Sequence, residues 1–201
     1  MIICIAGIDG SGKSTLVSNL YNKLAEQHTC SSMRIYDTFY TPKLQKKAAS
    51  FLRQHQIGVT RHNLMIAYMM HELSEISYPR LMNARQEADI VIIDRYLETI
   101  DFIVDHYGVD PRTLQPVIHN MPKPDVYIYL RVDPAVAYER ICMTREPSEG
   151  EELQAIIAAS GYYDNHAQRL GLTVVNGEAS EQDVLETCLQ IIESFHNVLQ
   201  S

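Results

Sequence analysis

The stretch GIDGSGKS at residues 7–14 limits most strongly what this chain can fold into. It fits the pattern G-x-x-x-x-G-K-[ST] in full, with Gly7, Gly12, Lys13 and Ser14 at the fixed positions. The loop follows the apolar run IICIA and precedes the helical pattern of LVSNLYNKL. A glycine-rich loop between a buried strand and a helix is typical of α/β domains that bind phosphate groups at the helix N-terminus.

The residue types of this loop explain how it would hold an anion. Gly7, Gly10 and Gly12 let the backbone turn so that successive N–H groups face one anion. Lys13 places a positive charge near the β and γ phosphates, and the Ser14 hydroxyl is a ligand for Mg²⁺. We therefore expect the chain to bind a nucleoside triphosphate with Mg²⁺. The expected nucleotide-binding residues of the loop are Gly7, Ile8, Asp9, Gly10, Ser11, Gly12, Lys13, Ser14 and Thr15.

Short apolar runs alternate with helical patterns along the rest of the chain, which predicts a parallel sheet covered by helices on both faces. The expected strands cover residues 2–6, 32–36, 89–94, 125–132 and 172–176. The expected helices cover residues 13–27, 43–54, 60–86, 97–107, 111–119 and 180–199, and one more starts at Asp133-Pro134. We predict one α/β domain over residues 1–201, with the three-layer fold of P-loop NTPases and a five-stranded parallel sheet.

Charge and composition exclude some classes of partner. The 201 residues carry a formal net charge of -8, whereas a domain that grips nucleic acid is usually basic. No apolar stretch approaches the roughly 20 residues that a membrane-spanning helix needs. The scattered cysteines Cys4, Cys30, Cys142 and Cys188 form no CxxC pair. We expect reduced, buried thiols in a cytoplasmic protein that binds neither nucleic acid nor membrane.

A second motif follows the third expected strand, where Asp94 and Arg95 end the run IVIIDRY. The carboxyl ends of parallel strands gather the ligands of such sheets, so Asp94 is expected to hold Mg²⁺ and Arg95 to face a phosphate. The alternative is that Asp94 caps the helix that follows. A GTPase would carry D-x-x-G after this strand, and Asp94 is instead followed by Arg95-Tyr96-Leu97. A small-molecule kinase fits this pattern better.

Three motifs together resemble the thymidylate kinase family and, more broadly, the nucleoside monophosphate kinases. They are GIDGSGKST, the DRY of residues 94–96, and PKPDVYIYLRVDPAVAYER at residues 122–140. The resemblance implies transfer of the ATP γ-phosphoryl group to a nucleoside 5′-monophosphate, dependence on Mg²⁺ and a homodimer. Helices over 43–54, 60–86 and 97–107 are candidates for the dimer face.

The resemblance also implies roles for single residues. Asp9 corresponds to an acidic residue near the acceptor, and Lys13, Asp94 and Arg95 join it as expected catalytic residues. The loop has no arginine of its own, so the basic group is expected in a lid over residues 141–152, with Arg145 closing on the transferred phosphoryl group. The alternative for Arg145 is a surface arginine beside Glu146. The adenine is expected between Arg140 and the stretch that contains Asn176 and Gly177.

The acceptor side departs from the family pattern. After the second strand the family carries an arginine, whereas YDTFYTPKLQKK offers Asp37 and Lys43. In the long helix, Ile66 and Met70 stand where the family has a stacking aromatic residue and an arginine. The expected acceptor-binding residues are Asp37, Lys43, Ile66, Met70 and Tyr96. Tyr68, His71 and Arg61 are further candidates, as are Glu98, Thr99 and Asp101, which are alternatively ordinary helix residues; core packing is the alternative for the methionines.

Three functions stay open at this point. The first is phosphoryl transfer to a nucleoside monophosphate, with dTMP as the leading acceptor. The second is a deoxynucleoside kinase, or a kinase of another nucleotide-like acceptor, in which Asp37 acts as a base on a hydroxyl group. The third is a silent ATP-binding switch protein that works through a partner.

Overall fold

The computed structural model describes most of the chain. Backbone and side chains are described for residues 1–35, 46–60, 63–105, 108, 110, 112, 114–148 and 150–195. The backbone alone is described for residues 42–45, 61–62, 106 and 196–200.

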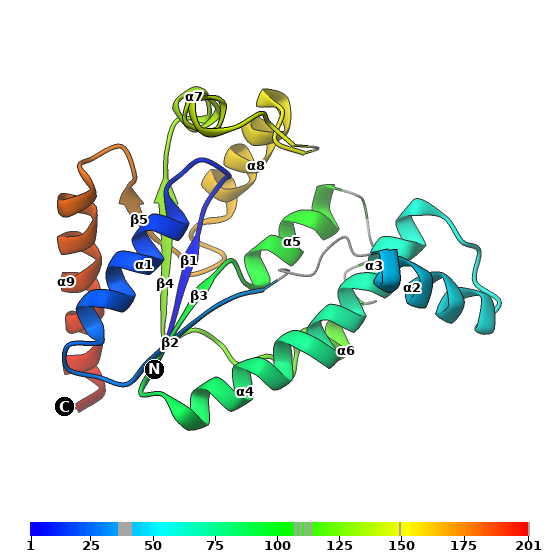
Figure 1. The fold of residues 1–201 in the computed structure, drawn as a ribbon, viewed down its shortest axis with the longest axis horizontal. Helices are drawn as coiled ribbons and strands as arrows, with labels where there is room; N and C mark the ends of the chain where they lie inside the picture. Colours follow the sequence, from blue (N-terminus) through cyan, green and yellow to red (C-terminus); the bar gives the residue numbers. More distant parts are fainter. Residues whose placement is uncertain are drawn as a thin grey trace.

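Five parallel strands form one sheet in the order β2-β3-β1-β4-β5, which confirms the expected fold class (Figure 1). The central strand β1 pairs with β3 on one side and with β4 on the other. The loop that follows β1 therefore leaves the sheet at the middle of its carboxyl edge, where parallel sheets bind their ligands. The strands are β1 Ile2–Ala6, β2 Cys30–Arg34, β3 Ile90–Asp94, β4 Val126–Arg131 and β5 Thr173–Asn176.

The helices agree with the sequence expectation in most places. They are α1 Lys13–Leu24, α2 Pro42–Gln54, α3 Arg61–His71, η1 Glu72–Ser77, α4 Tyr78–Glu87, α5 Leu97–His106, α6 Gln115–Ile118, α7 Pro134–Thr144, α8 Leu153–His166 and α9 Glu181–Gln200. The single helix expected over residues 60–86 is a continuous helical path whose middle, η1, is π-helical. The helix expected over 111–119 is reduced to α6 in the part of it that is described. No helix was expected over the range of α8.

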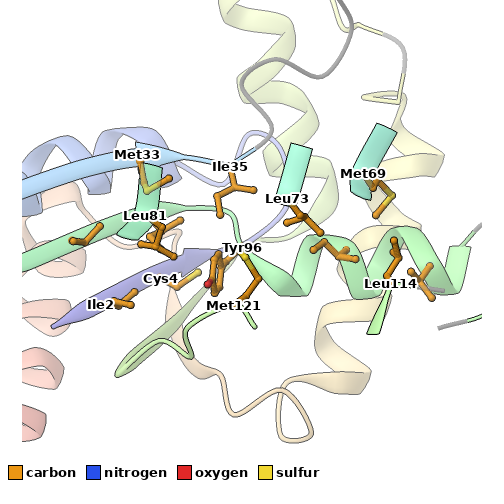
Figure 2. Packing of buried hydrophobic residues seen from close by; sticks show 14 residues of the cluster. Ile2, Cys4, Met33, Ile35, Met69, Leu73, Leu81, Tyr96, Leu114 and Met121 are labelled. Atoms are coloured by element: carbon orange, nitrogen blue, oxygen red, sulfur yellow. The ribbon is translucent and has the colours of Figure 1, made fainter. Parts of the chain in front are cut away.

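The alternating side chains of β1 show why this strand lacks polar residues. Ile2 and Cys4 point to one face, where they join a cluster with Leu73 of η1 and Leu81 of α4 (Figure 2). Ile3 and Ile5 enter the opposite cluster, which α1 and α9 cover. Each fully buried isoleucine contributes about 1.5–3 kcal/mol to the free energy of unfolding. The sheet is therefore held from both faces directly below the phosphate-binding loop.

The cysteine expectation holds in part. Cys4 and Cys188 are buried, but Cys30 is half-buried and Cys142 on α7 is exposed, which corrects the expectation that all four are buried. Within the described ranges, no helix is both long enough and apolar enough to cross a membrane.

Candidate active site

The phosphate-binding loop connects β1 to α1 and depends on its glycines. Gly10 has φ +78°, and a Cβ added there would lie 2.2 Å from the Ala137 carbonyl oxygen of α7. Gly7 has φ +148°, and a Cβ there would lie 2.8 Å from the Leu130 carbonyl oxygen of β4. Only glycine combines this backbone geometry with so close an approach. The loop is thus pressed between the end of β4 and the first turns of α7.

Lys13 lies inside this loop with its side chain almost fully buried. Its Nζ donates a hydrogen bond of 2.6 Å to the Ile8 carbonyl oxygen. Burial, followed by the positive charge of Arg95, lowers the pKa of Lys13 to about 7. Bound phosphates would oppose both effects, because a neighbouring negative charge favours the protonated amine.

Ser14 and Asp94 meet at the start of α1 and the end of β3. Ser14 Oγ donates to Asp94 Oδ2 over 2.9 Å, and Asp94 Oδ1 is buried without a partner in the described part of the chain. A hydroxyl and an unsatisfied carboxylate oxygen fit Mg²⁺, which binds proteins through one or two oxygen ligands and completes its shell with water and phosphate. The described residues hold no cluster of three His, Cys, Asp or Glu side chains that could bind a metal by itself.

Arg95 follows Asp94 and turns its guanidinium toward the loop. Its Nη2 donates to the Asp9 carboxylate, and the Arg95 side chain is mostly buried. Burial acts to raise the pKa of Asp9, but Arg95 and then Lys13 outweigh it and keep that pKa below its usual value. Asp9 therefore stays ionised at neutral pH. The Arg95 Nε has no partner among the described residues, so the guanidinium keeps a donor for an anion.

A cavity of about 440 Å³ opens on one side of the loop. It lies between the loop, α1, α7 and the turn after β5, and Arg140 Nη1 donates to the Gly177 carbonyl oxygen across it over 3.2 Å. The structure therefore brings Arg140 and Gly177, both predicted to lie near the adenine, together. Asn176 does not line the cavity and instead accepts the Glu178 N–H over 3.0 Å. The lining is Gly10, Ser11, Gly12, Thr15, Leu16, Asn19, Leu130, Arg140, Ile141, Thr144, Arg145, Gly177, Ala179, Glu181 and Val184.

Arg145 reaches this cavity from the segment after α7. Its guanidinium donates two hydrogen bonds to the Glu151 carboxylate, one of them 2.6 Å long, while Glu146 offers only its backbone carbonyl. These bonds, assisted by Ser148, lower the pKa of Glu151 to about 2 despite its burial. Residues 141–144 of the expected lid form the last turn of α7. The connection between α7 and α8 begins at Arg145.

A second cavity, of about 190 Å³, opens on the other side of the loop. Asp9 and Arg95 lie at its polar end, and side chains from α3, α5 and α8 form the rest. The sequence expectation included Gly7, Ile8, Asp9, Arg95 and Thr99 but missed the apolar side chains from α3, α5 and α8. The spacing of Thr99, Phe102 and Ile103 on one face of α5 was a usable signal. The lining is Gly7, Ile8, Asp9, Met65, Arg95, Thr99, Phe102, Ile103, Gly150, Ala155, Ile156, Ala159 and Tyr163.

Several expected acceptor-binding residues lie elsewhere. Ile66 and Met70 are partly buried and pack against the core cluster below α3. Met65 is the residue of α3 that lines the smaller cavity. Core packing is therefore the role that the structure gives to Met70. Tyr96 is fully buried and donates from its hydroxyl to the Pro122 carbonyl oxygen over 2.6 Å, so it is wrong as an acceptor contact.

Some of the remaining acceptor candidates lie outside the described residues, and others lie away from the cavity. Asp37 and the side chains of Lys43 and Arg61 lie outside the described residues. Glu98 is buried and does not line the smaller cavity, and the Asp101 carboxylate lies 3.6 Å from Arg169 of the segment after α8.

Comparison with known proteins places the chain among nucleotide kinases. The family model described as thymidylate kinase matches residues 5–187. The probable thymidylate kinase 1 of Saccharolobus solfataricus is 26% identical over 192 residues, which cover 96% of both chains. The thymidylate kinase of Leptospira borgpetersenii is 27% identical over 95% of this chain and 92% of its own.

A solved structure supports the fold independently. Deoxyadenosine kinase from M. mycoides with bound dATP superposes with a TM-score of 0.65, covers 96% of this chain and 100% of its own, and is 20% identical. This likeness concerns the fold alone. The family model, in contrast, spans nearly the whole sheet and both cavities. The chain therefore belongs to the thymidylate kinase family.

Proposed function

We propose that this protein transfers the γ-phosphoryl group of ATP to a nucleoside monophosphate, with dTMP as the first candidate acceptor. The observation that carries the proposal is the pair of cavities that meet at one phosphate-binding loop. Gly10 and Gly12 line the first cavity, and Asp9 and Arg95 line the second. Donor and acceptor phosphates held in these cavities would face each other across the loop, as phosphoryl transfer requires.

The donor would lie in the larger cavity. Arg140 and Gly177 would enclose the adenine, and the backbone N–H groups of the loop would bind the phosphates. Lys13 would exchange the Ile8 carbonyl oxygen for phosphate oxygens and become fully protonated. Ser14 and Asp94 would hold Mg²⁺, which would supply positive charge to the bound phosphates.

The acceptor would bring its phosphate to Arg95. An oxygen of that phosphate forms the new bond to the γ phosphorus, while the bond between the γ phosphorus and the bridging oxygen breaks and leaves ADP. Arg145 would leave Glu151 and neutralise charge on the transferred group. Such transfer needs little covalent help from the protein, so position and electrostatics supply most of the acceleration.

The rest of the acceptor would occupy the apolar end of the smaller cavity. Phe102 and Met65 offer apolar surface there, and Thr99 and Tyr163 add hydroxyl groups. No charged side chain lines this cavity besides Asp9 and Arg95, as far as the described residues go. A neutral base ring suits this lining, because aromatic and thioether groups pack against flat rings.

The test is ADP release from Mg·ATP with purified protein and a panel of acceptors. The panel contains dTMP, dUMP, CMP, UMP, AMP and GMP together with the matching nucleosides, and Lys13→Ala serves as the blank. We expect turnover with a monophosphate and none with the nucleosides. Turnover with nucleosides alone would assign a deoxynucleoside kinase, and ATP binding without any turnover would indicate a binding role.

We also propose that the protein forms a homodimer. The support is a group of exposed apolar side chains on α2 and on the connection to α3, namely Phe51, Ile57 and Val59. Burying such side chains against a partner subunit removes apolar surface from water and so stabilises the dimer.

A further inference from the structure

The backbone of Arg95 has an uncommon conformation. Its φ is 68°, in the left-handed region that residues with a Cβ seldom adopt. Among the described non-glycine residues, only Gln56, in the exposed connection after α2, shares this feature. The Arg95 N–H donates to the Ile5 carbonyl oxygen over 3.1 Å, so β1 holds the peptide before Arg95 in place.

The peptide after Arg95 is held by a carboxylate. The Tyr96 N–H donates to both oxygens of Glu98, at 2.9 Å each. Thr99 Oγ1 donates to the same carboxylate over 3.1 Å, and the Tyr127 hydroxyl of β4 donates to it as well. Tyr127 in turn accepts the Glu98 N–H over 3.1 Å. The two peptides that flank Arg95 are thus fixed from opposite sides.

Glu98 is an unusual residue for this place, because its side chain is fully buried. Burial raises the pKa of Glu98, although the bonds from Tyr127 and Tyr96 act in the opposite direction. A buried carboxylate costs free energy unless all its oxygens are bonded. A serine or threonine at the N-cap would satisfy an N–H group in the first turn of α5 without that cost, but it would leave the N–H of Tyr96 itself without a partner. The contacts therefore indicate a task beyond capping the helix.

We propose that Glu98 is a positioning residue, whose carboxylate holds the Tyr96 N–H and thereby keeps Arg95 in the backbone conformation that directs its guanidinium to Asp9 and the smaller cavity. The inference rests on the proposed function only in taking Arg95 as the residue that binds the acceptor phosphate. Glu98 itself touches no substrate. Its effect reaches the site through a single backbone conformation.

The test compares two conservative variants with opposite defects. Glu98→Gln keeps the length and one acceptor oxygen but loses the charge, whereas Glu98→Asp keeps the charge but withdraws the carboxylate by one methylene from the Tyr96 N–H. We expect Glu98→Asp to raise KM for the acceptor by roughly tenfold or more, since small displacements of a binding group are costly. KM for ATP should stay unchanged, and Glu98→Gln should resemble the parent protein.

Tyr127→Phe is the matched control, because it removes a hydroxyl from the same network and leaves the bond to Tyr96 intact. It should lower the melting temperature without raising KM for the acceptor. The inference is wrong if Glu98→Asp binds the acceptor normally, if both KM values rise together, or if Glu98→Gln is as defective as Glu98→Asp.

Two readouts separate this inference from the proposed function. In the Arg95→Ala background, Glu98→Asp should add nothing to the loss of monophosphate binding measured by calorimetry. A crystal structure of Glu98→Asp should show Arg95 at a negative φ, released from Asp9. The backbone conformation of Arg95 does not depend on turnover, so this readout applies even if no acceptor in the panel is phosphorylated. An unchanged positive φ at Arg95 would overturn the inference even if the protein phosphorylates dTMP.

Discussion

At the scale of one residue, Lys13 shows how the charge of the phosphate-binding loop depends on the phosphates that it binds. Its amine is buried against a carbonyl oxygen, with Arg95 as a positive neighbour, and its pKa of about 7 leaves it partly deprotonated at neutral pH. A lysine in water has a pKa of about 10.4. Lys13 is therefore expected to become fully protonated only when phosphates bind.

Nucleotide binding should consequently take up protons. The pKa of Lys13 is low in the free protein and rises in the complex. Proton uptake is therefore largest at pH values between the pKa of the free protein and that of the complex. The affinity for Mg·ATP falls as the pH rises through this range. Calorimetry of Mg·ATP binding at about pH 8 in buffers of different ionisation enthalpy should give close to one proton, because the free amine is then largely neutral. Lys13→Ala should lose this uptake, and equal heats in all buffers would contradict the expectation.

Single residues also show what the sequence could predict. Gly7 to Ser14, Asp94 and Arg95 were predictable because a motif fixes both their types and their places in a strand-loop-helix unit. Ile66 and Met70 were assigned by position along a helix, and an error of one residue turns a side chain by about 100°. Met65 lines the smaller cavity, whereas Ile66 and Met70 do not and pack partly buried against the core cluster. Which face of a helix turns toward a cavity depends on tertiary packing, and a single sequence does not show that packing.

At the scale of elements, the loop depends on how closely β4 and α7 approach it. Gly10→Ala should place a Cβ against the Ala137 carbonyl oxygen and strain a positive φ, and we expect a loss of about 1–3 kcal/mol in the free energy of unfolding together with weaker ATP binding. Urea denaturation and nucleotide titration would measure both effects.

Gly161→Ala is the matched control for this prediction. Gly161 lies inside α8, and a Cβ there would meet nothing within 4 Å. Alanine is the better helix former, so this change should raise the free energy of unfolding by about 0.5–1 kcal/mol. Equal effects of the two substitutions would show that the space at Gly10 is less tight than its contacts indicate.

Elements also differ in how well the sequence revealed them. The strands β1, β3 and β4 were predictable because they are continuous apolar runs between polar turns. Helix α8 was missed because LQAIIAASGYYDNH contains a glycine and its Glu152 N-cap makes no side-chain bond to the first turn. It is held by tertiary contacts instead, since Ile156, Tyr162 and Tyr163 pack in one cluster with residues of α7. Packing partners that lie elsewhere in the chain leave no local pattern.

At the scale of the whole molecule, the proposed dimer gives a clear measurement. Light scattering after size exclusion should report twice the chain mass of 22.9 kDa. Phe51→Glu should shift the protein to the monomer, because an ionised side chain would be buried in the interface. Phe195→Glu on α9, where the phenylalanine is similarly exposed at 44% against 47%, is the control and should leave the mass unchanged. A monomeric parent protein would contradict the proposal.

The architecture as a whole was the most predictable level, because alternation of strands and helices allows few topologies. The central place of β1 has a consequence for synthesis on the ribosome. β1 is made before its neighbours, yet it pairs with β4, whose last residue is Arg131. At about 5–20 residues per second, the nascent chain carries an incompletely paired, wholly apolar strand for several seconds or longer. Chaperones would meet this segment during that interval, and the ability to bind ATP would mark a chain whose synthesis has passed β4.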